Sequence, residues 1–214
     1  MNHFSACTRA GWICLAGVVL ILSSGCGALR STKIEQPSFY TLDSGIVSTP
    51  VSVADTAPIL IINSPHASAG FDTPRIIYVR DAHKLEYYAH NEWIDTPARM
   101  LAPLIIAAVE NSGMFRAVMQ TPSSAIGHFR LDTGIIRLQH EVGSQPGRVR
   151  FTLRAYMVDN NTRDVVGWEE FDEIVPVASE DPYGGVVAAN LAVKKVMERL
   201  ASFCAESAMN WQPR

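Results

Sequence analysis

Short apolar runs and alternating segments mark much of the chain after residue 58 as strand. Ile59 to Ile62 is a continuous aliphatic run, typical of a strand that is covered on both faces. Between Arg148 and Asp159, apolar residues alternate with basic and polar ones, so we expect one face in the core and the other in water or under a partner. Residues 39–42 are expected to form a short extended segment. Further strands are expected over residues 75–80, 84–90, 114–120, 129–140 and 165–177, and the pair 75–80 and 84–90 reads as a hairpin. The acids of the last strand suggest cross-strand pairing with the arginines of 148–159; they are Glu169, Glu170, Asp172 and Glu173.

The first helix is expected to begin at Pro97, because proline is well tolerated at the first helical position and Asp95 or Thr96 can cap the free N–H groups. Apolar residues then recur at helical spacing as far as Val109, and Asn111-Ser112-Gly113 ends the helix, with Gly113 suited to a left-handed cap. Pro103 lies in the second turn. The helix must therefore begin close to Pro97 or kink.

A second helix is expected to open at Asp181 and Pro182 and to run to about Ser207. Its apolar stripe comprises Val186, Ala189, Val193, Val196, Leu200 and Phe203. The order βββ-α-ββββ-α predicts an α+β domain, in which two main helices pack on a largely antiparallel or mixed sheet.

The beginning of the chain has the layout of an export signal. Residues 1–10 contain one base and no acid, residues 12–22 are an apolar run of 11, and the small residues 23–25 precede Cys26. A helix that crosses a bilayer needs about 20 apolar residues, so this run is too short for a comfortable span. We expect it to be removed.

The run Leu22-Ser23-Ser24-Gly25-Cys26 resembles a lipobox in its looser form, since leucine most often lies one residue nearer the cysteine. This resemblance implies that Cys26 is lipidated, and Gly27 at the next position implies passage to the outer membrane. The alternative is an ordinary signal cleaved nearby, with Cys26 left as a free thiol. The expected organisation is residues 1–25 as a lipoprotein signal peptide, 26–37 as a lipidated tether and 38–214 as the folded domain.

Composition is that of one globular domain, with 48% hydrophobic and 18% charged residues among 214. Without residues 1–25 the chain has 17 basic and 21 acidic residues, because Arg9 is the only charged residue removed. Such mild acidity predicts no binding to nucleic acid. If Cys26 is acylated, only Cys204 remains as a thiol, so no disulfide holds the domain, and we expect this thiol to be buried and inert.

Catalytic and cofactor motifs are missing from the sequence. It contains no Walker A motif, no G-x-G-x-x-G and no G-x-S-x-G, and its histidines, cysteines and acids lack metal-site spacing. We expect no cofactor and no metal. A periplasmic hydrolase with a site assembled from His90, Glu92 and Asp95 is the enzymatic alternative, although capping and the helix dipole also explain acids beside a helix start.

Residues 76–115 carry several uncommon residue types at characteristic spacing. The segments are IIYVRD at 76–81, LEYYAH at 85–90, EWIDTPARML at 92–101 and SGMF at 112–115. This pattern closely resembles the ABC-type transport auxiliary lipoproteins, a family that includes the paraquat-inducible protein C type. The Tyr-Thr-Leu at 40–42 is similar to the opening strand of that family, so the resemblance covers essentially the whole mature chain.

The resemblance implies a fold similar to the amino-terminal domain of TolB. It also implies a non-enzymatic role beside an ABC permease, its ATPase and a mammalian-cell-entry-domain protein, which together move lipids across the envelope. Because the family's partners form rings, self-association is left open by analogy. A general outer-membrane scaffold of the TolB kind is an alternative that partner identity would distinguish.

Aromatic and arginine residues concentrate around the expected hairpin and its exit to the first helix, and such residues dominate interface hot spots. The candidate partner interface comprises Tyr78, Arg80, Tyr87, Tyr88, Trp93 and Arg99. Core and sheet packing is the alternative for each aromatic, and solvated surface for each arginine. Adjacent strand residues point to opposite faces, so we expect Trp93 to be structural and at least one of Tyr87 and Tyr88 to be exposed.

Overall fold

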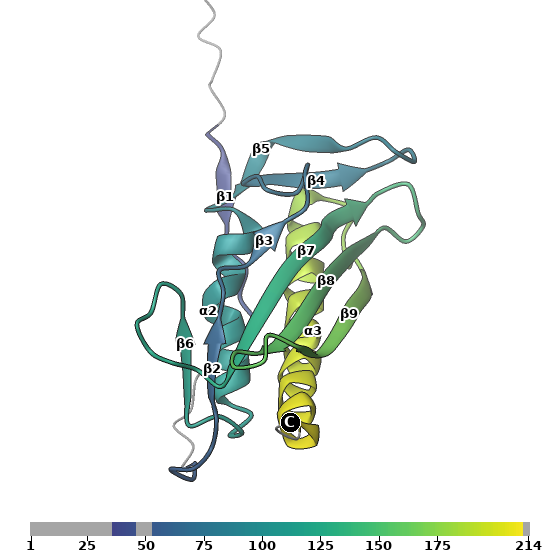
Figure 1. The fold of residues 1–214 in the computed structure, drawn as a ribbon. Coiled ribbons are helices and arrows are strands. Elements are labelled where there is room, and N and C mark those ends of the chain that lie inside the picture. The colour runs from purple at the N-terminus through teal and green to yellow at the C-terminus, as the bar shows by residue number, and fades with distance from the viewer. Residues whose placement is uncertain (1–35, 46–52, 212–214) are drawn as a thin grey trace, which may run out of the picture. The chain divides into compact units, whose positions relative to one another are not determined.

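The computed structural model describes residues 36–45 and 53–211, which belong almost entirely to one of the chain's two compact units, Pro37–Arg214. The expected signal, Cys26 and most of the tether lie outside the described residues. Over the described ranges the fold is α+β, with nine strands in one mixed sheet and two helices, which confirms the expected class (Figure 1).

The elements are β1 (Ser38–Tyr40), β2 (Ile59–Ile62), β3 (His66–Ala67), β4 (Arg75–Val79), β5 (Glu86–Trp93), α2 (Pro97–Glu110), β6 (Ala117–Gln120), β7 (Phe129–Glu141), β8 (Arg148–Asp159), β9 (Val165–Pro176) and α3 (Pro182–Asn210). Five strands precede the first helix, whereas the expected order had three, so two strands were missed. One of the extra strands, β3, has only two residues and follows Pro65, which leaves no periodic pattern to predict it from.

β7 is the central strand of the sheet. One of its edges pairs antiparallel with β8 over the whole length, and β9 continues the sheet beyond β8. The other edge pairs with β2, β3 and β4 in succession, all parallel to it. β6 lies beyond β2, while β5 and then β1 lie beyond β4.

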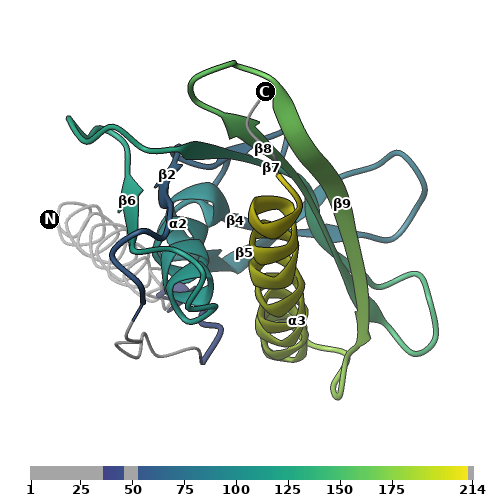
Figure 2. The same cartoon turned by 60° about the horizontal axis from the view of Figure 1, so that its bottom comes forward.

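Both helices cover the same face of the sheet, behind it in Figure 1 and in front of it in Figure 2. The alternation of apolar and polar residues in β8 decides which side chains face the helices. Phe151, Leu153 and Met157 point toward the helices and are fully buried, whereas Arg150, Arg154 and Tyr156 point away. All six residues of the expected α3 stripe are buried against this core, as the 3.6-residue period requires.

The two helix starts differ in how they are capped. Asp181 accepts a hydrogen bond from the Gly184 N–H at 2.7 Å, as expected of a capping aspartate. Thr96 occupies the capping position of α2, but its side chain makes no capping bond, so the expectation of a side-chain cap there was wrong. α2 begins at Pro97 as expected, and Gly113 adopts a φ of +65° beyond its end.

Candidate functional site

The aromatic hairpin, defined as β4 and β5 with Tyr78, Tyr87 and Tyr88, contains most of the residues expected to contact a partner. The rings of Tyr78 and Tyr88 lie 4.6 Å apart at their centroids, and the guanidinium of Arg80 lies 5.8 Å from the Tyr78 ring. On the other side of β5, the Tyr87 ring is 39% exposed and lies under the guanidinium of Arg75 at 5.1 Å. The hairpin therefore presents an aromatic and cationic surface.

Tyr88 connects the hairpin to the core through a histidine that the sequence did not single out. Its hydroxyl forms a hydrogen bond of 2.9 Å with Nδ1 of His140, at the end of β7. A Cβ added to Gly185 would lie 2.7 Å from that nitrogen, so glycine allows α3 to approach the ring. The hairpin, the central strand and the start of α3 thus meet at one buried histidine.

The electrostatics of this pair favour neutral side chains. Burial lowers the pKa of His140 from its ordinary value, against the opposing effect of Glu180 and Asp181. Burial, together with Tyr78 and the same two acids, raises the pKa of Tyr88 to about 12. Near neutral pH these shifts favour the uncharged form of both groups.

Two other residues of the candidate interface lie apart from the hairpin surface. Trp93 is only 4% exposed and packs in the core, so it supports the site without being able to contact a partner. Arg99 is exposed on α2, and its Nε lies 3.3 Å from a carboxylate oxygen of Asp95. The burial of Trp93 and the exposure of Tyr87 confirm the expected division of the aromatics between core and surface.

Among the residues of the hydrolase alternative, Asp95 is explained by local structure. The Asp95 carboxylate accepts a hydrogen bond from the Thr96 N–H at 2.7 Å and also pairs with Arg99. Within residues 36–45 and 53–211, no group of three His, Cys, Asp or Glu residues could hold a metal ion. Cys204 is fully buried, and burial raises the pKa of its thiol to about 12, as expected for an inert cysteine.

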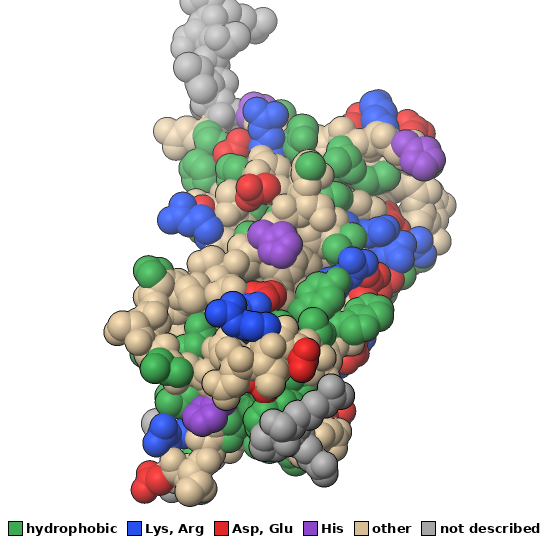
Figure 3. Space-filling view, in the orientation of Figure 1, with side chains coloured by type: hydrophobic (Ala, Val, Ile, Leu, Met, Phe, Trp, Pro, Cys, Tyr) green, Lys and Arg blue, Asp and Glu red, His purple; other side chains and the backbone are tan. Residues whose placement is uncertain are grey.

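A second surface with exposed hydrophobic side chains lies on the outer face of β7, β8 and β9, the face turned away from both helices (Figure 3). Tyr156 and Trp168 are cross-strand partners with stacked rings 6.4 Å apart, and they are 36% and 62% exposed. The sequence reasoning did not select them. Its only signal was the alternation over residues 148–159, which placed a tyrosine on the face expected to be wet or covered by a partner.

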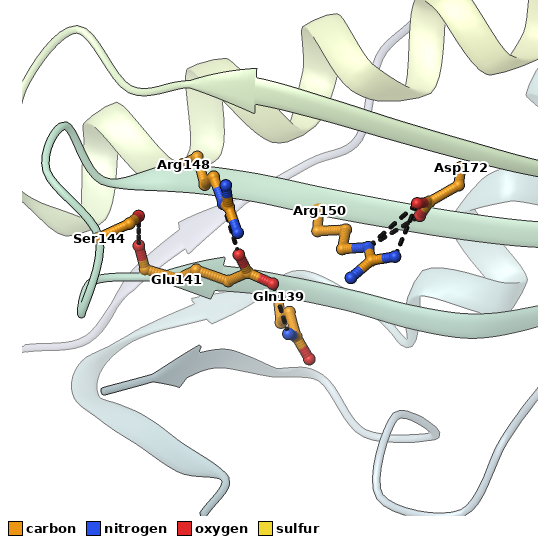
Figure 4. A network of polar contacts seen from close by, with 6 residues as sticks. All are labelled: Gln139, Glu141, Ser144, Arg148, Arg150 and Asp172. Carbon is orange, nitrogen blue, oxygen red and sulfur yellow. Dashed lines mark hydrogen bonds and ion pairs between the residues drawn. The ribbon is translucent and has the colours of Figure 1, made fainter. Parts of the chain in front are cut away.

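Ion pairs flank this stack along the outer face. Arg150 donates to both carboxylate oxygens of Asp172, and Arg148 donates to Glu141 at 2.6 Å (Figure 4). Hydrogen bonding from Arg150 holds the pKa of the Asp172 carboxyl below its ordinary value. The contact with Arg150 confirms the expected cross-strand pairing for Asp172. The ion pair between Arg154 and Glu170, at 2.6 Å, confirms it for Glu170.

Glu173 departs from that pattern. It was expected to face an arginine of the sheet, but it points toward the helices and accepts from Lys195 of α3 at 2.9 Å.

No helix of residues 36–45 and 53–211 combines the length and the hydropathy needed to span a membrane.

Comparison with known proteins gives one family and a shared fold. The model of the ABC-type transport auxiliary lipoprotein component family matches residues 40–201. The crystal structure of protein XCC0632 from Xanthomonas campestris is similar, with a TM-score of 0.70, 21% identity, and coverage of 80% of this chain and 97% of that one. An uncharacterized protein of known structure has a TM-score of 0.60 at 9% identity, covering 80% and 98%. No curated protein matches the chain.

Proposed function

The chain belongs to the ABC-type transport auxiliary lipoprotein family, and from this premise we propose that it is a lipid-anchored, non-enzymatic accessory subunit of an envelope lipid transporter. Its partners in this proposal are an ABC permease, the separate ATPase and a mammalian-cell-entry-domain protein. The observation that carries the proposal is the family match over residues 40–201, which spans nearly the whole folded domain.

Cys26 is the proposed anchor. An export signal precedes it, and the small residues before it suit a lipoprotein signal peptidase. Several acyl chains together hold a protein stably on a leaflet, at about 0.8 kcal/mol per buried methylene. With Gly27 following, we assign the protein to the periplasmic face of the outer membrane, where residues 26–37 tether the domain 38–214.

A binding role is supported by the chemistry of the aromatic hairpin. Tyr88 and His140 bond to each other, and their pKa shifts keep both groups neutral, which suits a structural support better than acid–base work. On the same hairpin, Arg80 beside Tyr78 and Tyr87 on the other side of β5 are exposed. Exposed aromatic and arginine side chains on a rigid base are typical of interface hot spots, so we assign the partner contact to them.

The experiment is co-purification of the full-length protein from detergent-solubilised membranes, followed by identification of bound proteins. We expect recovery of a mammalian-cell-entry-domain protein and an ABC permease. Tyr87→Ala and Arg80→Ala should each reduce that recovery, whereas Tyr183→Ala, which truncates a tyrosine 60% exposed on α3, should not. Repeated recovery of neither partner would remove the specific claim, and recovery of unrelated envelope proteins would favour a general scaffold.

A further inference from the structure

β9 is an edge strand of unusual length. It pairs with β8 from Val165 to Pro176 and with no other strand among the described residues. Along its 12 residues, one side of the backbone therefore presents N–H and C=O groups that no strand uses. Such an edge is a template for another extended chain.

The side chains of β9 point to a basic partner. The strand contains four acids and no lysine or arginine. Glu170, Asp172 and Glu173 have partners on β8 or α3, whereas the Glu169 carboxylate makes no ion pair or hydrogen bond within residues 36–45 and 53–211. Pairing with β9 of a second copy would place like charges on adjacent strands, which is unfavourable. A different chain that carries positive charge fits better.

A hollow beside this edge extends the negative charge. It has a volume of about 340 Å³ and lies between β9 and α3, where it is lined by Glu169, Glu198, Arg199, Ser202, Phe203 and Glu206. The single arginine is already engaged, because its guanidinium lies over the Phe171 ring and reaches Glu173 at 3.5 Å. Three carboxylates are left to face an incoming chain.

The other face of β9 offers apolar contacts. Trp168 and Ile174 lie on the outer face and are 62% and 42% exposed. Residues of an added strand alternate between the two faces. One set would meet the carboxylates of the hollow, and the other set would meet the indole and the isoleucine.

We propose that the free edge of β9 binds an extended segment of a partner protein by strand addition. The segment carries lysine or arginine at the alternate positions that face Glu169, Glu198 and Glu206. At the positions between them it carries aliphatic or aromatic residues, which pack on Trp168 and Ile174. This surface is separate from the aromatic hairpin, and the inference does not depend on the proposed transporter.

Three synthetic peptides test the chemistry on the full-length protein in detergent. The first is a labelled octapeptide, Lys-Val-Lys-Tyr-Lys-Val-Lys-Val, the second replaces each lysine by glutamate, and the third methylates alternate backbone nitrogens of the basic peptide. Fluorescence anisotropy should give saturable binding of the first and none of the second. The third should bind at least tenfold more weakly, because strand addition needs backbone N–H donors.

Two variants locate the site, and each has a matched control. Trp168→Ala and Glu169→Lys should each weaken binding of the basic peptide at least tenfold. Tyr183→Ala, another exposed aromatic, and Asp72→Lys, another exposed acid, should leave it unchanged. Melting temperatures check that all four variants fold, and both test positions lie at the surface edge of the sheet.

Several results would overturn the inference. Absence of saturable binding of the basic peptide would overturn the proposal. Equal binding of the basic peptide and its methylated form would show that charge alone holds the peptide and that no strand is added. If the protein alone sediments as an oligomer and Trp168→Ala dissociates it, the face belongs to a second copy. Failure here would leave co-purification through the hairpin untouched, so the two proposals can be separated.

Discussion

At the scale of single residues, Trp93 and Tyr87 both belong to β5 but differ in burial, because Trp93 is 4% exposed and Tyr87 is 39% exposed. Trp93→Ala should lower the free energy of unfolding by about 3–5 kcal/mol, because it empties a fully packed site. That loss approaches the whole stability of a small domain. Tyr87→Ala should change it by no more than about 0.5 kcal/mol, since the ring is exposed. Urea denaturation of both variants measures the difference, and similar losses would contradict the assignment.

His140 should make stability depend on pH. Its pKa is lowered in the folded protein, so below the ordinary value the unfolded chain binds a proton that the folded chain resists. The contribution of the neutral histidine is fully present above about pH 6.5 and is lost as the pH falls. His140→Gln keeps a polar group near Tyr88 but cannot titrate. The urea midpoint of the unmodified protein should fall between about pH 7.5 and pH 5, and that of His140→Gln should fall less. An equal fall of the urea midpoint in the two proteins would refute the account.

Sequence reasoning reached the burial of Trp93 and Cys204 because strand alternation and helical spacing are local. It did not reach the Tyr88 to His140 bond, whose partners are 52 residues apart. Nor could it place Glu173, because the choice between a sheet arginine and Lys195 depends on which face of β9 turns toward α3.

At the scale of elements, the two helix starts provide a matched test of capping. Asp181→Ala removes a side-chain acceptor from the Gly184 N–H and should cost about 1 kcal/mol. Thr96→Ala removes no capping bond, so its cost should be smaller than that of Asp181→Ala. Thermal or urea denaturation of both variants checks the order. A larger loss for Thr96→Ala would show that the capping geometry has been misread.

The long elements were predictable and the short ones were not. β8 has the bounds expected from its alternation, and α3 begins at the expected proline. β3 pairs two residues with β7 and draws its stability from that neighbour, so nothing in its own sequence announces it. The hairpin was found, but β5 extends to Trp93, three residues beyond its expected end.

At the scale of the whole molecule, sheet order escaped prediction for a topological reason. Three consecutive strands, β2, β3 and β4, pair with successive stretches of one edge of β7, which comes much later in the chain, so this arrangement depends on contacts distant in sequence. The outer face was foreseen only as wet or covered by a partner. Its aromatic stack depends on the β8–β9 register, which places Tyr156 opposite Trp168.

The anchor gives a prediction at the same scale. Cys26→Ser removes the thiol that the lipobox resemblance marks for acylation, so the protein should lose a metabolically incorporated fatty-acid label. It should also keep its signal segment and migrate more slowly or remain at the inner membrane. Cys204→Ser is the matched control. Because the Cys204 thiol is buried and is not the proposed lipid site, this variant should keep the fatty-acid label. Label that persists in Cys26→Ser would place the lipid elsewhere.

The central claim is that this chain contacts an envelope transporter through the aromatic hairpin. Site-specific photo-crosslinking in intact cells tests it most directly, with p-benzoylphenylalanine in place of Tyr87 and, as control, in place of Tyr183. At position 87 we expect an adduct whose second protein is a mammalian-cell-entry-domain protein or an ABC permease, and none of this kind at position 183. A folded, lipidated protein that gives no such adduct at position 87, or the same adducts at both positions, would contradict the claim.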